Sequence, residues 1–194
     1  MTERVAAVVL AGGRSSRFGR DKLAEPIDGR PMLDHVIERL RAVTSEIVVV
    51  AAAGAMPDIP SDVDLVTDDI PFEGPLAGLA VGLAAVDPGV ERVIVVGGDM
   101  PTIVPAVLDR LVGALERRQA AVLADGERAR PLPLAVRRSA AATAAGRLLA
   151  DGERRLRALL ERLDVEVIPE ERWREDDPAG DSLRDIDTPD DLPG

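Results

Sequence analysis

The chain has 194 residues, of which 46% are hydrophobic and 30% are charged, a balance typical of one globular domain. Its net charge of −11 and its 2% aromatic content argue against a nucleic-acid-binding protein, which needs a basic face and often uses aromatic stacking platforms. The absence of cysteine excludes disulfides and thiolate metal sites, and a single histidine excludes histidine-cluster metal sites.

The first predicted element is a buried strand over residues 5–10, which runs directly into a glycine loop. Gly12 and Gly13 adopt positive φ readily and expose backbone N–H groups, and consecutive N–H groups form an anion-binding concavity. Four cations follow in the same loop: Arg14, Arg17, Arg20 and Lys22. In a chain of net charge −11, this local positive charge fits a triphosphate. The alternative interpretation is a glycine-rich turn with a solvated basic face.

Helix and strand signals alternate in the next part of the chain. A turn is expected over residues 25–30, and Pro31 is expected to start a helix with an apolar stripe. His35 lies beside that stripe, and we interpret it as a partly exposed helix histidine without a chemical role. Buried strands are predicted over residues 47–51 and 63–67, and the second ends at Asp68. Such alternation indicates a layered α/β domain with parallel strands, where ligands bind beyond the carboxyl ends, so the glycine loop and Asp68 are expected to share one crevice.

A second glycine pattern follows at residues 74–83. Pro75 suits the first turn of a helix, and Gly78 and Gly82 then lie on one face of it. Because glycine costs about 1 kcal/mol in a helix interior, two on one face indicate a close approach, either by a neighbouring element or by a ligand.

The most apolar predicted strand covers residues 93–96 and ends in a Gly-Gly-Asp turn. Asp99 stands at its tip, where a carboxylate is a candidate Mg²⁺ ligand, because Mg²⁺ favours one or two carboxylates plus substrate phosphates and waters. The alternative is a turn or a helix-capping aspartate, since a helix is predicted just beyond, over residues 104–115.

The second half of the chain continues the α/β pattern. We predict strands over residues 120–124, 132–136 and 165–168, and helices over residues 140–149 and 156–163. Pro131 and Pro133 are expected to push the middle strand to a sheet edge or into a bulge. The charged residues 170–181 are interpreted as a solvated loop. Thr188 or Asp187 is expected to cap a last helix.

The string from Leu10 to Lys22 resembles the signature L-A-G-G-x-x-x-R-(M/F)-G-x-D-K of nucleotidyltransferases with a Rossmann-like GT-A fold. Within that group the chain is most similar to the molybdenum cofactor guanylyltransferases. Further stretches match family landmarks in family order, namely residues 74–78, 97–101, 125–128, 152–155 and 185–192. The resemblance implies a three-layer α/β/α sandwich with a mostly parallel central sheet. It also implies a single domain over residues 1–194, in which residues 1–100 bind the nucleotide and residues 101–194 bind the acceptor.

The resemblance implies a reaction in which GMP is joined from GTP to the phosphate of molybdopterin, with release of pyrophosphate and use of Mg²⁺. Carried over by position, the catalytic residues are Arg17, Lys22 and Asp99, and Asp99 also holds the metal. The implied nucleotide contacts are Leu10, Ala11, Gly12, Gly13, Lys22, Asp68, Gly74 and Asp99. The implied acceptor contacts are Arg128, Arg130, Asp185 and Asp187, of which Asp187 is either a second carboxylate near the metal or only a helix cap.

The chain departs from the family pattern in three respects. Ala51 stands where an Asn at the end of the second strand is common, so one base or ribose contact is missing. Arg130 replaces a His on the expected pterin side, and Asp185 and Asp187 replace two Asn residues. The D-I-D-T-P string is also seen in the related molybdenum cofactor cytidylyltransferases. The enzyme alternatives are therefore a nucleotidyltransferase that uses CTP or one that acts on another small phosphate acceptor.

The expected partners are the substrates GTP and molybdopterin, with transient contacts to cofactor-biosynthesis proteins or recipient molybdoenzymes. A membrane partner is not expected, because no apolar run approaches about 18 residues, and without a visible signal peptide the expected location is the cytoplasm. The non-enzyme alternative is a nucleotide-binding module that delivers the cofactor. The retained Lys22 and Asp99 argue against that module, and pyrophosphate release would decide between the two.

Overall fold

The computed structural model describes residues 4–12, 23, 25–44, 46–68 and 74–186 of the chain. Four of the predicted site residues, Gly13, Arg17, Lys22 and Asp187, lie outside these ranges, as does the expected last helix. Of Asp68 only the backbone is described. Among the described helices, none combines the length and the apolar character that crossing a membrane requires.

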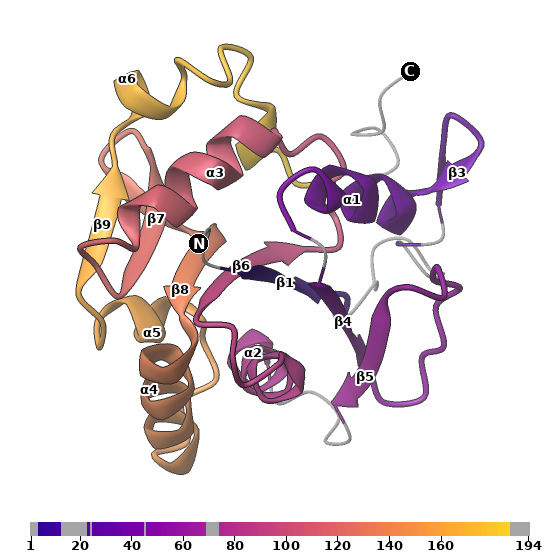
Figure 1. Cartoon of the computed structure of the whole chain (residues 1–194), viewed down its shortest axis with the longest axis horizontal. Helices are drawn as coiled ribbons and strands as arrows, with labels where there is room; N and C mark the ends of the chain where they lie inside the picture. Colours follow the sequence, from indigo (N-terminus) through magenta and orange to yellow (C-terminus); the bar gives the residue numbers. More distant parts are fainter. Residues whose placement is uncertain (1–3, 13–22, 24, 45, 69–73, 187–194) are drawn as a thin grey trace.

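A seven-stranded sheet with the order β5-β4-β1-β6-β8-β7-β9 forms the centre of the molecule (Figure 1). Its strands are β1 (Val5–Leu10), β4 (Glu46–Ala52), β5 (Asp64–Asp68), β6 (Arg92–Gly97), β7 (Ala120–Asp125), β8 (Arg128–Arg137) and β9 (Val165–Ile168). All neighbouring strands pair in parallel except β8, which is antiparallel to both β6 and β7. A separate two-stranded hairpin joins β2 (Pro26–Ile27) to β3 (Arg30–Pro31). The predicted mostly parallel sheet is confirmed.

Two hydrophobic cores lie on opposite faces of this sheet. Side chains alternate between the faces of a strand, so Ala7 and Val9 of β1 enter one core while Ala6 and Val8 enter the other. Helices α1 (Met32–Arg41), α3 (Pro105–Ala114) and α6 (Glu170–Trp173) cover the first core. Helices α2 (Pro75–Ala85), α4 (Arg138–Ala150) and α5 (Arg157–Leu160) cover the second. Figure 1 shows these two helix layers above and below the sheet, and the predicted α/β/α sandwich is confirmed.

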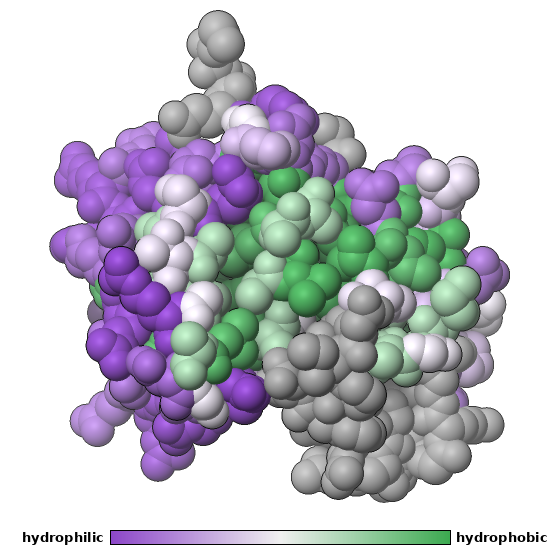
Figure 2. Space-filling view, turned by 90° about the horizontal axis from the view of Figure 1, so that it is seen from below, coloured by the Kyte–Doolittle hydropathy of each residue, from purple (hydrophilic) through white to green (hydrophobic). Residues whose placement is uncertain are grey.

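Helix α2 packs unusually close to the sheet. A Cβ added at Gly82 would overlap Cγ1 of Val8 and would lie 3.0 Å from Cγ2 of Val50. An added Cβ at Gly78 would be in ordinary contact with Leu10 Cδ2, at 3.6 Å. The glycine face of α2 therefore accommodates strands β1 and β4, which confirms the interpretation as close approach of a neighbouring element. Helix α2 contains no polar side chain, and hydrophobic residues extend over the middle of the molecular face shown in Figure 2.

The prolines of residues 131–133 do not place their strand at an edge. Strand β8 lies inside the sheet between β6 and β7, so the edge alternative was wrong. The bulge alternative is confirmed, because the β7–β8 register shifts between Val122 and Ala124. Proline lacks the N–H that a ladder needs, and the irregular stretch of β8 is where that loss is tolerated.

Two further expectations need correction. The helix expected over residues 156–163 is much shorter, because α5 ends at Leu160. Residues 170–181 are not simply a solvated loop, since they contain α6 and lead into the short 3-10 helix η2 (Asp181–Leu183). Trp173 is fully buried in this segment and its indole N–H donates to the carbonyl oxygen of Ala124 at 2.9 Å. Because the neighbouring residues in the sequence are charged, composition alone did not predict that Trp173 is buried.

Candidate nucleotide site

The order of the strands reverses at β1, which has β4 on one side and β6 on the other. In open α/β sheets such a switch point opens a crevice beyond the carboxyl ends of the strands, where ligands bind. Backbone hydrogen bonds join the three strand ends here. The N–H of Gly98 donates to the carbonyl oxygen of Leu10 at 3.0 Å, and the N–H of Ala11 donates to that of Val50 at 2.9 Å. The start of the glycine loop and the end of β6 are thus held side by side.

The glycine loop begins at this edge and faces β4. Gly12 is exposed, and a Cβ added to it would lie 3.5 Å from the backbone nitrogen of Ala52. Ala52 in turn pairs with Asp68 in the β4–β5 register. The structure therefore brings the backbones of Gly12 and Asp68 to the same sheet edge. Ala51, where an Asn side chain is common in the family that the sequence resembles, is buried and supplies no polar group.

The segment after the glycine loop returns to the same place. Leu23 follows Lys22 in the sequence, and a Cβ added at Gly98 would lie 3.1 Å from its side chain. The same Cβ would lie 3.5 Å from the Cα of Ala11, so both Leu23 and Ala11 lie close to Gly98. This contact gave no signal in the sequence, because a lone leucine after a charged loop is not informative.

Gly74 marks the entrance of α2 and has a positive φ of 85°. A Cβ there would lie 2.8 Å from the carbonyl oxygen of Arg154, which also accepts a hydrogen bond from the N–H of Leu76 at 3.3 Å. The turn over residues 151–155 is itself held by Glu153. Hydrogen bonds from the Arg155 side chain and from the backbone N–H groups of Arg155 and Arg154 lower the pKa of Glu153 to about 2. The sequence did not predict that this turn packs against the start of α2.

Asp99 follows β6 and is half-buried at the crevice. Its carboxylate folds back over Gly97, where an added Cβ would overlap Oδ1 of Asp99. The capping alternative was wrong, because α3 begins at Pro105 and its N-cap residue is Val104. Asp99 lies in a turn, and its backbone carbonyl accepts a hydrogen bond from the N–H of Ile186 at 3.0 Å.

The donor set suits Mg²⁺ better than a transition metal. Among the described residues no group of three or more His, Cys, Asp or Glu side chains could hold a metal ion. Mg²⁺ does not require such a group, because it is commonly bound through one or two carboxylates together with substrate phosphates and water. A single carboxylate at the switch point, beside the start of a glycine loop, fits that pattern.

Two of the predicted acceptor residues meet. Nη2 of Arg130 lies 3.0 Å from Oδ2 of Asp185, and Nη1 lies 3.7 Å from Oδ2 of Asp125. Asp185 directly precedes Ile186, so this ion pair is linked to Asp99 through the Ile186 hydrogen bond. Arg128 is not part of the cluster, since its exposed side chain forms no ion pair with the described residues.

Hydrogen bonds that the sequence did not predict hold this C-terminal segment in place. Thr102 Oγ1 donates to the carbonyl oxygen of Asp181 at 3.1 Å, and Ser182 Oγ accepts from the N–H of Val104 at 3.1 Å. His35, by contrast, is structural as predicted. It is half-buried on α1, and its Nε2 lies 2.9 Å from the carbonyl oxygen of Ile27 in the β2–β3 hairpin.

Comparison with known proteins identifies the family. The model of the MobA-like NTP transferase domain matches residues 7–167. This range begins within β1 and ends within β9, so it covers nearly the whole sheet. The chain belongs to this family.

Relatives of this MobA-like NTP transferase cover nearly its whole length. A "Probable molybdenum cofactor guanylyltransferase" of Chloroflexus aggregans is 35% identical over 97% of this chain and 91% of that protein. A "Molybdenum cofactor guanylyltransferase" of Rhizobium leguminosarum bv. trifolii is also 35% identical, over 97% of this chain and 90% of that protein. The resemblance that the sequence carries is confirmed.

A solved structure shows the same fold. The crystal structure of molybdopterin-guanine dinucleotide biosynthesis protein A from Archaeoglobus fulgidus superposes with a TM-score of 0.78 and 26% identity, covering 96% of this chain and 94% of that one. The MobA-like NTP transferase described here is thus a nucleotidyltransferase with a Rossmann-like fold, and the predicted reaction class is confirmed.

Proposed function

We propose that this nucleotidyltransferase joins GMP from GTP to the phosphate of molybdopterin and releases pyrophosphate. The observation that carries the proposal is the Gly98–Leu10 hydrogen bond, which holds the start of the glycine loop beside the turn that contains Asp99. A triphosphate in the crevice would then meet backbone N–H groups on one side and a carboxylate-bound cation on the other. The guanylyltransferase names of the two relatives at 35% identity support GTP and molybdopterin as the substrates.

The reaction needs no nucleophile from the protein. An oxygen of the acceptor phosphate attacks the α-phosphorus of GTP in line and forms a new P–O bond. The bond between the α-phosphorus and the bridging oxygen of the β-phosphate breaks, and that oxygen takes the electron pair as pyrophosphate leaves. Catalysis therefore consists of positioning the two phosphates and of neutralising the charge that builds on them.

Backbone and side-chain groups of the crevice would have distinct roles in this reaction. N–H groups at Gly12 and Gly13 bind phosphate oxygens, while Arg17 and Lys22 neutralise the α-phosphoryl group and the leaving pyrophosphate. The nucleotide would be lined by Leu10, Ala11 and the start of α2 at Gly74. Asp68 lies at the same sheet edge. The roles of Gly13, Arg17 and Lys22, which lie outside the described residues, are inferred from their positions in the glycine-loop motif.

Mg²⁺ is the cofactor that we assign to Asp99. When bound, it would act as a Lewis acid on the phosphate oxygens and as a template for their orientation. Asp99 would hold the ion through its carboxylate, and the turn that follows β6 would fix the direction of that carboxylate. Asp187 serves either as a second carboxylate near the ion or as a helix cap.

The acceptor side is assigned to residues 101–194, and the nucleotide side to residues 1–100, within a single domain. Arg130 and Asp185 form the described part of the acceptor side, and we assign Arg128 and Asp187 to the same side. A guanidinium is a suitable group for a phosphate monoester because it donates paired hydrogen bonds. We expect the reaction to take place in the cytoplasm, where the product is handed to a recipient molybdoenzyme.

The proposal is tested by incubating the protein with α-labelled GTP, molybdopterin and Mg²⁺ and by looking for a labelled guanine dinucleotide together with pyrophosphate. Thermal melting with GTP, CTP, UTP or ATP plus Mg²⁺ tests the base. A shift with CTP alone would replace this proposal by the cytidylyltransferase alternative. Nucleotide binding without any pyrophosphate release would favour the delivery module.

A further inference from the structure

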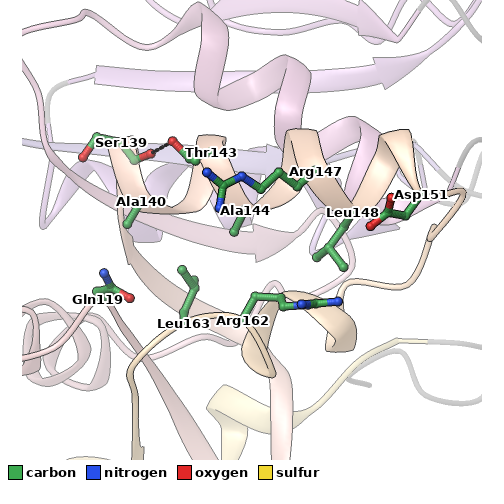
Figure 3. Close-up of a pocket in the computed structure, with 10 residues that line it drawn as sticks. All are labelled: Gln119, Ser139, Ala140, Thr143, Ala144, Arg147, Leu148, Asp151, Arg162 and Leu163. Atoms are coloured by element: carbon green, nitrogen blue, oxygen red, sulfur yellow. Dashed lines mark hydrogen bonds between the residues drawn. The ribbon is translucent and has the colours of Figure 1, made fainter.

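A groove outside the nucleotide crevice runs along helix α4. It has a volume of about 600 Å³ and lies between α4 and the connection from α5 to β9 (Figure 3). We call it the α4 groove and define it by its apolar lining of Ala140, Ala144, Leu148 and Leu163 and by two arginines, Arg147 and Arg162. Nothing in the proposed transfer reaction uses these residues.

The groove exists because α5 is short. A helix continuing to residue 163 would present Leu163 on the stripe of α5. The observed helix ends at Leu160, and the chain turns before β9 begins at Val165. Leu163 thereby faces Ala140 and Ala144 across the groove, and Figure 3 shows these side chains on its two walls. The spacing of residues 140, 144, 147 and 148 places one face of α4 along the groove, and the C-cap residue Asp151 lies at its end.

The two arginines of the groove are exposed and unused within the part of the chain that the structure describes. Neither Arg147 nor Arg162 forms an ion pair or a side-chain hydrogen bond there. Most of the other described arginines do. For example, Nη1 of Arg118 lies 3.0 Å from Oδ1 of Asp164, the residue before β9. In an acidic chain of net charge −11, these two guanidinium groups give the groove a local positive charge.

The remaining polar groups of the groove already have partners. Thr143 Oγ1 donates to the carbonyl oxygen of Ser139 at 2.9 Å, and Ser139 Oγ donates to Glu91. The side-chain oxygen of Gln119 accepts from the N–H of Asp164 at 3.0 Å. One carboxylate, Asp151, lies at the end of α4, so the groove still carries more positive than negative charge. A ligand therefore finds two free cationic donors and an apolar lining.

We infer that the α4 groove binds an extended, acidic segment of a partner protein, with carboxylates on Arg147 and Arg162 and aliphatic side chains on the alanine and leucine lining. Charge complementarity selects the acidic partner, since each guanidinium gains its first ion pair on binding. The absence of aromatic lining residues argues against a nucleotide base, which would seek a stacking partner. Two arginines are too few for a nucleic acid backbone or an anionic membrane surface.

The position of the groove gives such a partner access to the nucleotide crevice. The α4 groove ends at Asp151, and the turn over residues 151–155 that begins there contacts Gly74 through Arg154. A segment bound along α4 would thus point toward the entrance of α2. The binding inference does not depend on which nucleotide the crevice takes.

The test measures binding of a fluorescein-labelled peptide of alternating Glu and Leu residues to the full chain by fluorescence anisotropy, at roughly 50 mM salt where electrostatic screening is weak. We expect binding that weakens at higher salt. The doubly substituted variant R147E/R162E should bind at least about tenfold more weakly, which corresponds to about 1.4 kcal/mol. R39E is the control for the reversal of a single exposed charge, because Arg39 is an arginine on α1 without an ion pair among the described residues and lies in the opposite helix layer. It should leave binding unchanged.

A second variant tests the apolar lining without altering charge. Ala144→Trp fills the groove and should abolish peptide binding while the far-UV spectrum and pyrophosphate release stay as in the parent protein. Equal binding of a Gln-Leu peptide, or binding that survives R147E/R162E or A144W, would overturn the inference. So would self-association of the chain that A144W abolishes, because the groove would then be an interface between two copies.

Discussion

The backbone N–H of Ile186 donates a hydrogen bond to the carbonyl oxygen of Asp99, at 3.0 Å, and so fixes the C-terminal segment to the turn that carries the proposed metal carboxylate. Residues that are far apart in the sequence are thereby joined at one sheet edge. Asp185, the residue before Ile186, holds Arg130 of strand β8. The proposed nucleotide side and the proposed acceptor side of the crevice are thus connected by a short path of hydrogen bonds.

The first prediction concerns the carboxylate of Asp99. Asp99→Asn keeps the shape of the side chain but removes the charge, so we expect pyrophosphate release to fall about 10²-fold or more, with unchanged thermal stability. Lys22→Ala should lower turnover by orders of magnitude as well. Asp109→Asn, on the exposed side of α3, is the control and should retain full activity. Parent-like rates in both D99N and K22A would exclude the proposed site.

The second prediction concerns Arg130. Its ion pair with Asp185 is half-exposed, so Arg130→Ala should change the free energy of unfolding by only about 0–1 kcal/mol. Loss of the guanidinium should instead raise KM for the acceptor while leaving the affinity for the nucleotide unaltered. Steady-state kinetics with each substrate varied in turn separate the two effects. Arg117→Ala, an exposed arginine beyond α3, should change neither constant. An unaltered acceptor KM in R130A would remove Arg130 from the acceptor side.

The third prediction concerns the packing of α2 on the sheet. Gly82→Ala inserts a methyl group against Val8 and Val50, and we expect a loss of about 1–3 kcal/mol in the free energy of unfolding, measured by urea denaturation. Gly146→Ala on α4 is the matched control, because nothing lies within 4 Å of an added Cβ there. That change should stabilise the protein by about 0.5–1 kcal/mol through helix propensity. Similar effects of both substitutions would contradict the close approach.

The fourth prediction concerns the pH dependence of stability. Burial alone would raise the pKa of Asp177, which is 2% exposed, but hydrogen bonds from the backbone N–H and hydroxyl groups of Ser182 and from the N–H groups of Asp181 and Gly180 lower it below its usual value of 3.8. A lowered folded pKa contributes stability that is present above about pH 3.8 and is lost as the pH falls through the folded pKa.

Asp177→Asn should therefore destabilise the protein by about 1–3 kcal/mol at pH 7, and the difference from the parent should shrink below about pH 3.8. Urea denaturation at a series of pH values measures this difference. Asp58→Asn provides the comparison, because Asp58 is exposed and has no ion pair within the described part of the chain. A pH-independent difference between D177N and the parent would show that Asp177 acts only through its shape.

Much of the fold follows from the sequence because its signals are local. Residues 5–10 and 93–96 are apolar runs too short for helices, and they lie in the adjacent central strands β1 and β6. Gly78 and Gly82 predicted a close approach to one face of α2, since a glycine inside a helix is unfavourable without such a reason.

The errors come from relations between distant residues. The insertion of β8 between β6 and β7 depends on pairing with both strands, and neither proline reveals it. Trp173 is surrounded in sequence by charged residues, yet its partner Ala124 is on a distant strand. In the candidate site, the parallel direction of β1 and β6 made it predictable that their carboxyl ends lie at one edge of the sheet. The contacts of Arg154 with Gly74 and of Ile186 with Asp99 were not predictable.

The antiparallel strand β8 also bears on how the chain can be divided. Strand β6 obtains one of its two hydrogen-bonded neighbours from residues beyond position 100. A fragment that stops there would leave the apolar edge of Val93 to Val96 uncovered, and such an edge recruits other chains into aggregates. The proposed nucleotide-binding residues 1–100 therefore do not form a module that could be expressed, fused or exchanged without the second half of the chain, because β8 completes their sheet.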